Sequence, residues 1–398
     1  MLNVLWLCSW YPNNLFPFDG DFVQRHAQAA SLYNKINVIK LTPDPGAKNV
    51  TKVTRRFQEW PNLTETFIYY PKPRSFVGKA VAYFRWYSLY KYAVEEYIEK
   101  NGKPDLVHVH VPYKAGIVAQ QIKRKFKIPY VVTEHWGGYN NVIPGNYKER
   151  EPRFKNVIKD TFKKSSGLHT PSEYLAQQIQ GIVTKVPYTV IPNAVNVDYF
   201  NTNQRLERNG KFRLLHISNG VPVKNVQGII EAFNQLDNDD YEFTIIGFPK
   251  ELNDIYKKLN PSINFTGEIP YKEVAGYLNQ ADALVLFSDM ENSPCVIGEA
   301  LCCGVPVVAA NVGGIPELLD EFTGILIEPG NINSLLEAIH TLKGNTYNYS
   351  KIQTAEAAMD RFSYQQISFE TDLWYRSILM AGESGGWDKV LPVPAGSL

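Results

Sequence analysis

Short apolar runs alternate with helix-like segments along most of this sequence, and the alternation starts afresh near the middle of the chain. Alternation of this kind is typical of parallel sheets covered by helices on both faces. The sequence therefore predicts an α/β fold with two doubly wound, Rossmann-like sheets. The runs interpreted as strands are 3–8, 36–41, 107–111, 130–133, 167–170 and 188–191, then 212–217, 243–247, 263–267, 283–287, 306–309 and 324–327.

The restart places a domain boundary in the polar stretch 193–210. We expect an N-terminal domain over 1–192, completed by an amphipathic C-terminal helix at 363–380, and a C-terminal domain over 193–362. Residues 381–398 show no periodicity and are interpreted as a tail. Ligands of open α/β sheets bind at the carboxyl ends of the strands, so a site in a cleft between the two domains is expected.

Composition excludes several classes of protein. The chain has 398 residues and a net charge of +1, which gives no global signature of nucleic-acid binding. Its four cysteines have no zinc-like spacing, and we expect them to be buried thiols in a reducing compartment. The first ten residues lack a basic segment, and no apolar run reaches the ~18 residues of a membrane span. A cytoplasmic location, with contact at the inner face of the membrane left open, is the expectation.

The segment from Glu291 to Gly304 is the most informative for function. Ser293 suits an N-cap and Pro294 the first helical position, so a helix of roughly three turns is expected to end at Gly304. Free amides at its start, next to Glu291 and Glu299, suit a ligand that carries both an anion and hydroxyl groups. The plainer alternative is that Glu291 caps the helix and Glu299 is a solvated acid on the helix face.

Four other loops follow predicted strands and carry candidate groups. Gly20 would let the backbone approach a ligand, and His135 lies before two glycines at a strand end. Lys224 at a helix start indicates an anionic partner, although a solvated lysine is the alternative. Gly313 and the glycine after it could bind a ligand or simply complete a turn. An Asp-X-Asp metal site around Gly20 is a weaker interpretation than a turn with an N-cap.

Taken together, these motifs resemble the family 4 retaining glycosyltransferases, also called glycosyl transferases group 1, which have the GT-B fold. The resemblance spans nearly the whole chain. Its strongest parts are Glu291-x7-Glu299 with Glu-Ala-Leu-Cys-Cys-Gly-Val-Pro-Val-Val, then Gly-Gly-Ile-Pro-Glu-Leu from Gly313, and Ile-Pro-Asn-Ala-Val-Asn-Val-Asp-Tyr-Phe from Ile191. It implies an N-terminal acceptor domain and a C-terminal donor domain that binds a nucleotide sugar.

The resemblance also implies roles for single residues. Glu299 would hold the ribose, Lys224 would neutralise the diphosphate, and Glu291 would face the donor sugar. His135 would lie near the anomeric carbon, and Gly20 would let the first loop reach the phosphates. The remaining donor-binding candidates are Asn219, Glu268, Ile269, Ser293, Pro294, Cys295 and Val296.

The chain departs from the family at Ser218-Asn219, where Gly-Arg is usual, and at Asn193-Ala194, where Asn-Gly is usual. One expected diphosphate cation is therefore absent, and Arg25 is a conjectural substitute. Retention of configuration, no metal ion and no cofactor are implied, with the nucleotide sugar as a substrate. Transfer would proceed by attack on the face that the diphosphate leaves, without an enzymic nucleophile.

The acceptor is expected to be a glycan or a lipid-linked glycan of surface polysaccharide synthesis. Basic residues among aromatic ones at 69–92 and 148–164 suggest peripheral membrane contact, with ordinary solvated helices as the alternative. Two other readings of function stay open: a nucleotide-sugar epimerase or phosphorylase of GT-B architecture, and a two-domain sugar-binding protein without catalysis.

Overall fold

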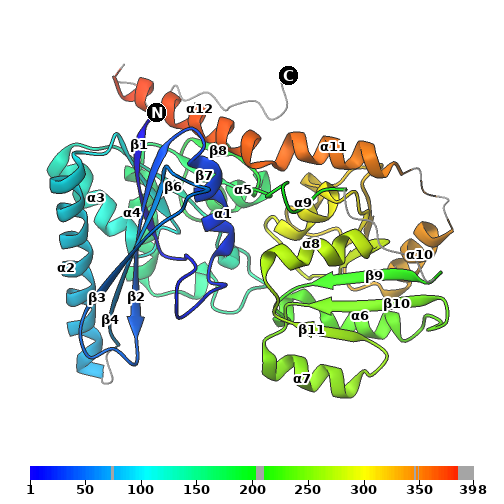
Figure 1. The fold of residues 1–398 in the computed structure, drawn as a ribbon. Helices are drawn as coiled ribbons and strands as arrows, with labels where there is room; N and C mark the ends of the chain where they lie inside the picture. The colour runs from blue at the N-terminus through cyan, green and yellow to red at the C-terminus, as the bar shows by residue number, and fades with distance from the viewer. Residues whose placement is uncertain (73–75, 203–209, 345–346, 348, 384–398) are drawn as a thin grey trace. The chain divides into compact units, whose positions relative to one another are not determined.

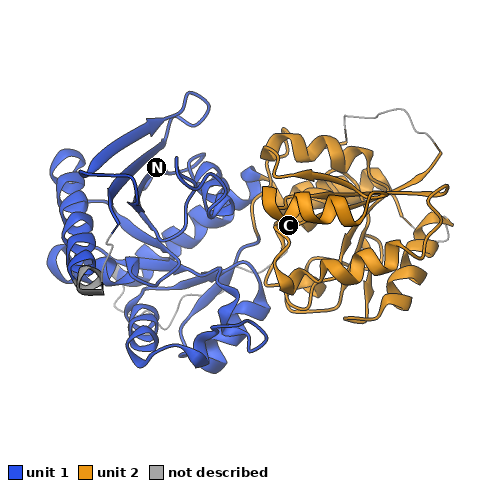
Figure 2. Ribbon diagram, turned by 90° about the horizontal axis from the view of Figure 1, so that it is seen from below, with its two compact units in different colours: residues 1–192, 364–398 blue, residues 193–363 orange. Residues whose placement is uncertain are grey.

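The computed structural model describes residues 1–72, 76–202, 210–344, 347 and 349–383. The chain forms two compact units, which Figure 2 shows in different colours. Unit 1 holds residues 1–192 and 364–398, and unit 2 holds residues 193–363. The predicted tail at 381–398 falls almost entirely outside the described residues.

Unit 1 is built on an eight-stranded sheet in the order β3-β4-β2-β1-β5-β6-β7-β8. All neighbouring strands pair in parallel except β3 and β4, which are antiparallel. The strands are β1 (Asn3–Cys8), β2 (Lys35–Asp44), β3 (Thr51–Arg56), β4 (Leu63–Pro71), β5 (Leu106–His110), β6 (Tyr130–Thr133), β7 (Leu168–Thr170) and β8 (Tyr188–Val190). The helices are α1 (Asp21–Ala30), α2 (Phe76–Asn101), α3 (Ala115–Phe126), α4 (Pro152–Lys164), α5 (Glu173–Ile182) and α12 (Tyr364–Glu383).

The two faces of this sheet bury different side chains because successive residues of a strand point to opposite sides. Leu5 and Leu7 belong to a core shared with α2 and α3 (Figure 1). Trp6, between them, instead contacts His108 and His110 of the neighbouring strand. Helix α12 covers this second face, where the Tyr375 hydroxyl lies 2.5 Å from His108 Nδ1. The last helix is therefore part of the core of unit 1, although it follows unit 2 in sequence.

Unit 2 contains a parallel six-stranded sheet in the order β11-β10-β9-β12-β13-β14. The strands are β9 (Phe212–Ile217), β10 (Tyr241–Ile246), β11 (Asn264–Gly267), β12 (Ala283–Leu286), β13 (Val307–Ala310) and β14 (Gly324–Ile327). The helices are α6 (Val226–Phe233), α7 (Lys250–Leu259), α8 (Tyr271–Gln280), α9 (Cys295–Cys302), α10 (Ile332–Lys343) and α11 (Lys351–Phe362). Leu214 and Leu215 enter separate cores on opposite faces, as the strand period requires.

The predicted α/β class with two Rossmann-like sheets is confirmed, but several elements differ from the sequence-based expectation. Strands β3 and β4 were missed because β3 is largely exposed and β4 contains a buried acid, Glu65, that interrupts its apolar pattern. Tyr11 and Gln24 donate hydrogen bonds to that carboxylate at 2.6 and 2.8 Å, which makes its burial tolerable. Helix α7 was missed because none of its residues is fully buried.

Candidate active site

Lys224 and Glu291 form an ion pair at the carboxyl end of the unit 2 sheet. The Lys224 Nζ atom lies 2.6 Å from Glu291 Oε1, and the two side chains are only 23% and 8% exposed. Lys224 ends a short 3₁₀ turn that follows β9, and Glu291 lies in the loop that follows β12. Since β9 and β12 are neighbours in the sheet, their carboxyl ends bring the two loops together. The Asp289 amide donates to the Val223 carbonyl at 2.8 Å and joins the loops through their backbones.

The Glu291 side chain has one engaged and one available oxygen. Ser288 Oγ donates to the same Oε1 atom at 2.8 Å, so this oxygen accepts from both Ser288 and Lys224. Among the described residues, no hydrogen bond is made to Glu291 Oε2. A carboxylate oxygen held in this way can accept a hydrogen bond from a ligand hydroxyl.

The backbone of Glu291 is fixed by the glycine pair at 313–314. The Gly314 amide donates to the Glu291 carbonyl at 3.0 Å. Gly313 has a φ of +56°, and a Cβ atom added to it would lie 1.8 Å from that same carbonyl oxygen. Only glycine therefore fits at Gly313 without displacing Glu291. Glycine is therefore required at this position because it packs against Glu291, and not simply because it completes a turn, as the sequence suggested.

Helix α9 begins later than the sequence predicts. Its first residue is Cys295 and its N-cap is Pro294, with no side-chain cap, so Ser293 is not the N-cap and Pro294 is not the first helical residue. The helix has eight residues, about two turns instead of three. Ser293 instead accepts a hydrogen bond on its carbonyl from Asn193 Nδ2 at 2.8 Å. Cys295 and Val296 form the first turn, where helix amides have no intrahelical acceptor.

The other donor-binding candidates of unit 2 lie in loops at the same edge of the sheet or just inside it. Glu299 is in the second turn of α9 and is 3% exposed. Asn219 follows β9 and is exposed, while Glu268 and Ile269 follow β11 and are exposed and half-buried. The structure thus places Asn219, Glu268 and Ile269 after the carboxyl ends of strands, as predicted, and Glu299 within a helix. The part of these residues in ligand binding stays a prediction.

Gly20 and His135, the remaining candidates, belong to unit 1. Gly20 is the N-cap of α1 with a φ of +69°, and an added Cβ would lie 2.7 Å from Trp10 Cβ. The backbone of Gly20 therefore packs closely against Trp10 of the same chain. That it also approaches a ligand stays a prediction. Arg25, the conjectural second cation, is buried in α1 and lies 3.4 Å from Asp21.

His135 lies in a group of histidine and aromatic rings. Its ring centre is 4.7 Å from that of Phe22, 5.9 Å from His26 and 6.3 Å from His110. Burial, with neighbouring imidazoles as a second cause, holds the pKa of His135 well below its usual value, so the ring is neutral at physiological pH. The preceding Glu134 accepts hydrogen bonds from the amides of residues 135 and 136 and from the Tyr139 hydroxyl at 2.6 Å, which fixes the local backbone.

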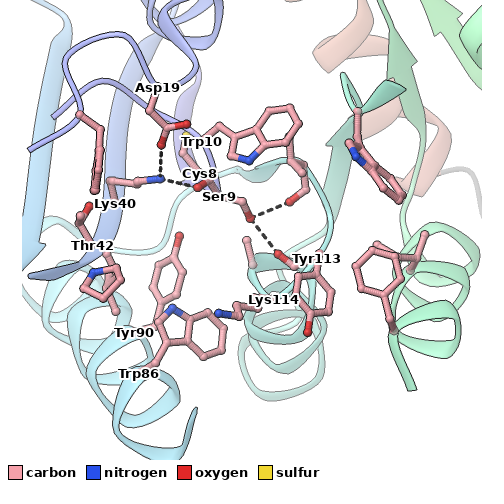
Figure 3. Close-up of a pocket in the computed structure, with 18 of the residues that line it drawn as sticks. Cys8, Ser9, Trp10, Asp19, Lys40, Thr42, Trp86, Tyr90, Tyr113 and Lys114 are labelled. Carbon is pink, nitrogen blue, oxygen red and sulfur yellow. Dashed lines mark hydrogen bonds and ion pairs between the residues drawn. The ribbon is translucent and has the colours of Figure 1, made fainter. Parts of the chain in front are cut away.

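A cavity of about 410 Å³ in unit 1 was not foreseen from the sequence. It lies at the carboxyl ends of β1, β2, β5 and β6 and is lined by residues from 8–19, 40–43, 111–115 and 134–136, with Trp86 and Tyr90 of α2 on the opposite side (Figure 3). The only sequence signal was the location of those loops after strands. The helix that supplies Trp86 could not be assigned to this edge without the structure.

Two features of the described residues concern metal ions and membranes. Within those residues, no group of three or more His, Cys, Asp or Glu side chains is arranged to bind a metal ion. None of the helices described is both long and apolar enough to cross a bilayer.

Comparisons with known proteins agree on one family. Residues 199–358 match the family model "Glycosyl transferases group 1", and residues 38–199 match "Glycosyltransferase Family 4". A relative from Bacillus subtilis (strain 168), named "Putative teichuronic acid biosynthesis glycosyltransferase TuaC", is 25% identical over 93% of this chain and 95% of its own length.

Solved structures share the fold. Sucrose-phosphate synthase from Thermosynechococcus elongatus aligns with a TM-score of 0.75 at 18% identity, covering 95% of this chain and 100% of that one. Anabaena HepE in complex with UDP and glucose aligns with a TM-score of 0.68 at 18% identity, covering 94% of this chain and 99% of that one.

Proposed function

The chain belongs to the group 1 glycosyltransferases of the GT-B fold, and we propose that it moves a sugar, with retention of configuration, from a nucleoside-diphosphate sugar to a glycan or lipid-linked acceptor. The observation that carries the donor assignment is the Lys224–Glu291 pair at the carboxyl end of the unit 2 sheet. It sets one ammonium group beside a carboxylate that has an available oxygen. The ammonium can bind the diphosphate, and the carboxylate oxygen can accept a hydrogen bond from a sugar hydroxyl.

In the proposed reaction the bond between the anomeric carbon and the diphosphate oxygen breaks, and negative charge develops on the leaving diphosphate. Lys224 and the first-turn amides of α9 stabilise that charge. The acceptor oxygen forms its bond on the same face of the sugar, and its proton passes to a diphosphate oxygen. Glu291 orients the donor sugar through a hydroxyl and forms no covalent bond, which is compatible with its engagement by Lys224 and Ser288.

Other residues have supporting roles in this proposal. Glu299 binds the ribose hydroxyls, and Asn219, Glu268 and Ile269 border the nucleotide. The neutral ring of His135 acts as a hydrogen-bonding group toward the donor sugar, with no charge of its own. Since Lys224 and backbone amides supply the positive charge, we propose that the reaction requires neither a metal ion nor a cofactor.

We propose surface polysaccharide synthesis at the inner face of the cytoplasmic membrane as the setting. The name of the Bacillus relative refers to teichuronic acid biosynthesis, which supports this choice. Helix α2 also exposes apolar side chains, with Val81 62% and Phe84 67% exposed, and such residues beside basic ones suit a membrane surface. Arg74, part of the basic stretch at 69–92, lies outside the described residues.

A screen of UDP, GDP and their sugars for protection against thermal unfolding tests the donor assignment, because a ligand of the native state raises its Tm. We expect one nucleotide to protect the wild type and a Lys250→Met variant, whose lysine is exposed and pairs with Asp254. Lys224→Met should lose most of the protection. Equal protection of the two variants would show that Lys224 does not bind the diphosphate.

A further inference from the structure

The cavity in unit 1 combines aromatic walls with positive charge. Eight of its residues carry aromatic rings: Trp10, Phe16, Tyr70, Trp86, Tyr90, Tyr113, Trp136 and Phe154. Flat apolar rings together with a few polar groups are typical of sites that bind small organic ligands. Its volume of about 410 Å³ falls within the range of such sites, ~300–1,000 Å³.

Three cations line the cavity, and only one of them is neutralised by a nearby acid. Lys40 lies 3.4 Å from Asp19, and its ammonium also donates to the Ser9 carbonyl. Lys114 and Arg150 have no carboxylate within 4.0 Å in the part of the chain that the structure describes. Each is instead placed over aromatic rings: Lys114 Nζ is 5.7 Å from the ring centre of Trp86, and the Arg150 guanidinium is 5.5 Å from that of Trp136.

The second acid of the cavity, Glu134, does not offset this charge fully. Its carboxylate accepts hydrogen bonds from Tyr139 and from two backbone amides, so its oxygens are directed at those donors. Burial raises the pKa of Glu134 to about 7, which leaves a large fraction of this group neutral at physiological pH. The cavity therefore keeps a positive excess at Lys114 and Arg150.

The loop that carries Lys114 is held in an unusual backbone conformation. Lys114 has a φ of +69° and Val111 a φ of +61°, which is rare for any residue other than glycine and most of all for a β-branched one. Ser9 Oγ lies 2.8 Å from the carbonyl oxygens of both Val111 and Tyr113 and fixes the loop. Strain of this kind persists where surrounding structure enforces it, often at ligand sites. Figure 3 shows the Lys114 ammonium directed into the cavity beside Trp86.

From these observations we infer that the unit 1 cavity binds the acceptor, and that it selects an acceptor saccharide bearing a phosphate or carboxylate group, with Lys114 binding the anion and the aromatic walls contacting the sugar ring. The inference rests on the proposed transferase function, because it names the substrate of that reaction. A neutral saccharide would leave the ammonium of Lys114 without a counter-charge inside a partly desolvated site. An anionic one supplies charge-assisted hydrogen bonds, which are about twice as strong as neutral ones.

Tryptophan fluorescence provides a readout confined to unit 1. The sequence has seven tryptophans, none of them within residues 193–363, and three line the cavity. We would titrate the full chain with glucose, glucuronate and glucose 6-phosphate, which differ only at the sixth carbon. Variants Lys114→Met and Lys114→Arg would be compared with Lys91→Met, a matched control on α2 whose lysine is 51% exposed and lies outside the cavity.

We expect the two anionic sugars to bind the wild type and Lys91→Met at least about tenfold more tightly than glucose, as one charge-assisted contact implies. Lys114→Met should reduce their affinity to that of glucose, and Lys114→Arg should restore much of it. The inference is overturned if Lys114→Met binds both anionic sugars as tightly as the wild type does. It is also overturned if glucose binds as well as the anionic sugars.

A competition experiment distinguishes the two sources of such an anion. Displacement of glucose 6-phosphate by a polyprenyl monophosphate in detergent micelles, and not by the micelles alone, assigns a lipid-linked acceptor. Failure of that lipid to displace it assigns a soluble anionic saccharide; either outcome supports an anion-selective cavity. UDP binding by calorimetry is the separate check of the donor site. If UDP does not bind while the anion preference depends on Lys114, the transferase proposal fails and the anion site stands.

Discussion

The glycine pair that supports Glu291 offers a direct test of the donor site. In Gly313→Ala the new Cβ would lie 1.8 Å from the Glu291 carbonyl oxygen, at a backbone φ of +56°. The left-handed conformation alone costs ~1–2 kcal/mol for a residue with a side chain. Relief of the contact requires Glu291 to move away, with loss of the hydrogen bond from Gly314, which is worth ~1 kcal/mol. With strain of ~1–3 kcal/mol from overpacking, we expect unit 2 to lose about 3–6 kcal/mol of unfolding free energy.

Gly330→Ala is the matched control for this experiment. Gly330 has a φ of +72° in the same unit, but nothing lies within 4 Å of an added Cβ. It should therefore lose only the ~1–2 kcal/mol of the backbone conformation and keep nucleotide affinity unchanged. The difference between the two variants isolates the contact with Glu291 from the general cost of an alanine in the left-handed region.

Denaturant unfolding followed by two probes would separate the units. Tryptophan fluorescence reports unit 1, because no tryptophan lies within residues 193–363, while far-UV circular dichroism reports both units. Calorimetry with the protecting nucleotide gives the affinity. We expect Gly313→Ala to shift only the unit 2 transition and to weaken nucleotide binding. Identical stability and affinity in Gly313→Ala and Gly330→Ala would refute the argument that Gly313 positions Glu291.

Three further predictions concern single groups. Lys224→Met should weaken nucleoside-diphosphate binding about ten- to a hundredfold, as loss of a charge-assisted contact implies, while Lys250→Met leaves the calorimetric Kd unchanged. Glu299→Ala should weaken binding of UDP more than binding of inorganic pyrophosphate, if this carboxylate holds the ribose; equal losses would argue against that role. Burial lowers the pKa of His169 and His216 from 6.5 to about 4, so the unfolded chain takes up protons that the folded chain resists. The unfolding free energy should fall as pH drops from about 6.5 toward 4, and a Tm that stays constant between pH 7 and pH 5 would contradict this.

Near the site, the structure changes the sequence-based interpretation of Ser293 and Lys224. Ser293 has the side chain of a helix cap, yet its carbonyl accepts from Asn193, one hundred residues earlier, and the helix starts two residues later. A solvated Lys224 was a reasonable alternative from sequence. Its contact with Glu291 joins residues 67 positions apart, and that contact exists only because β9 and β12 are neighbours in the sheet.

Local sequence determined the elements in which apolar residues predominate. The runs Phe212–Ile217 and Gly324–Ile327 are strands with the predicted bounds, because large apolar residues make up most of each run. The same pattern, with loops following each strand, was enough to place the donor candidates of unit 2 at carboxyl ends. The α/β class and the family motif could therefore be read without coordinates.

Tertiary structure decided everything that depends on groups far apart in sequence. Glu65 could be buried in β4 only because Tyr11 and Gln24 reach it, so the strand is invisible to an apolar pattern. The cavity of unit 1 forms where Trp86 on α2 meets the loop of Lys114. Sequence patterns record what each residue prefers locally, whereas a binding site is set by which side chains the sheet order brings within a few ångströms of one another.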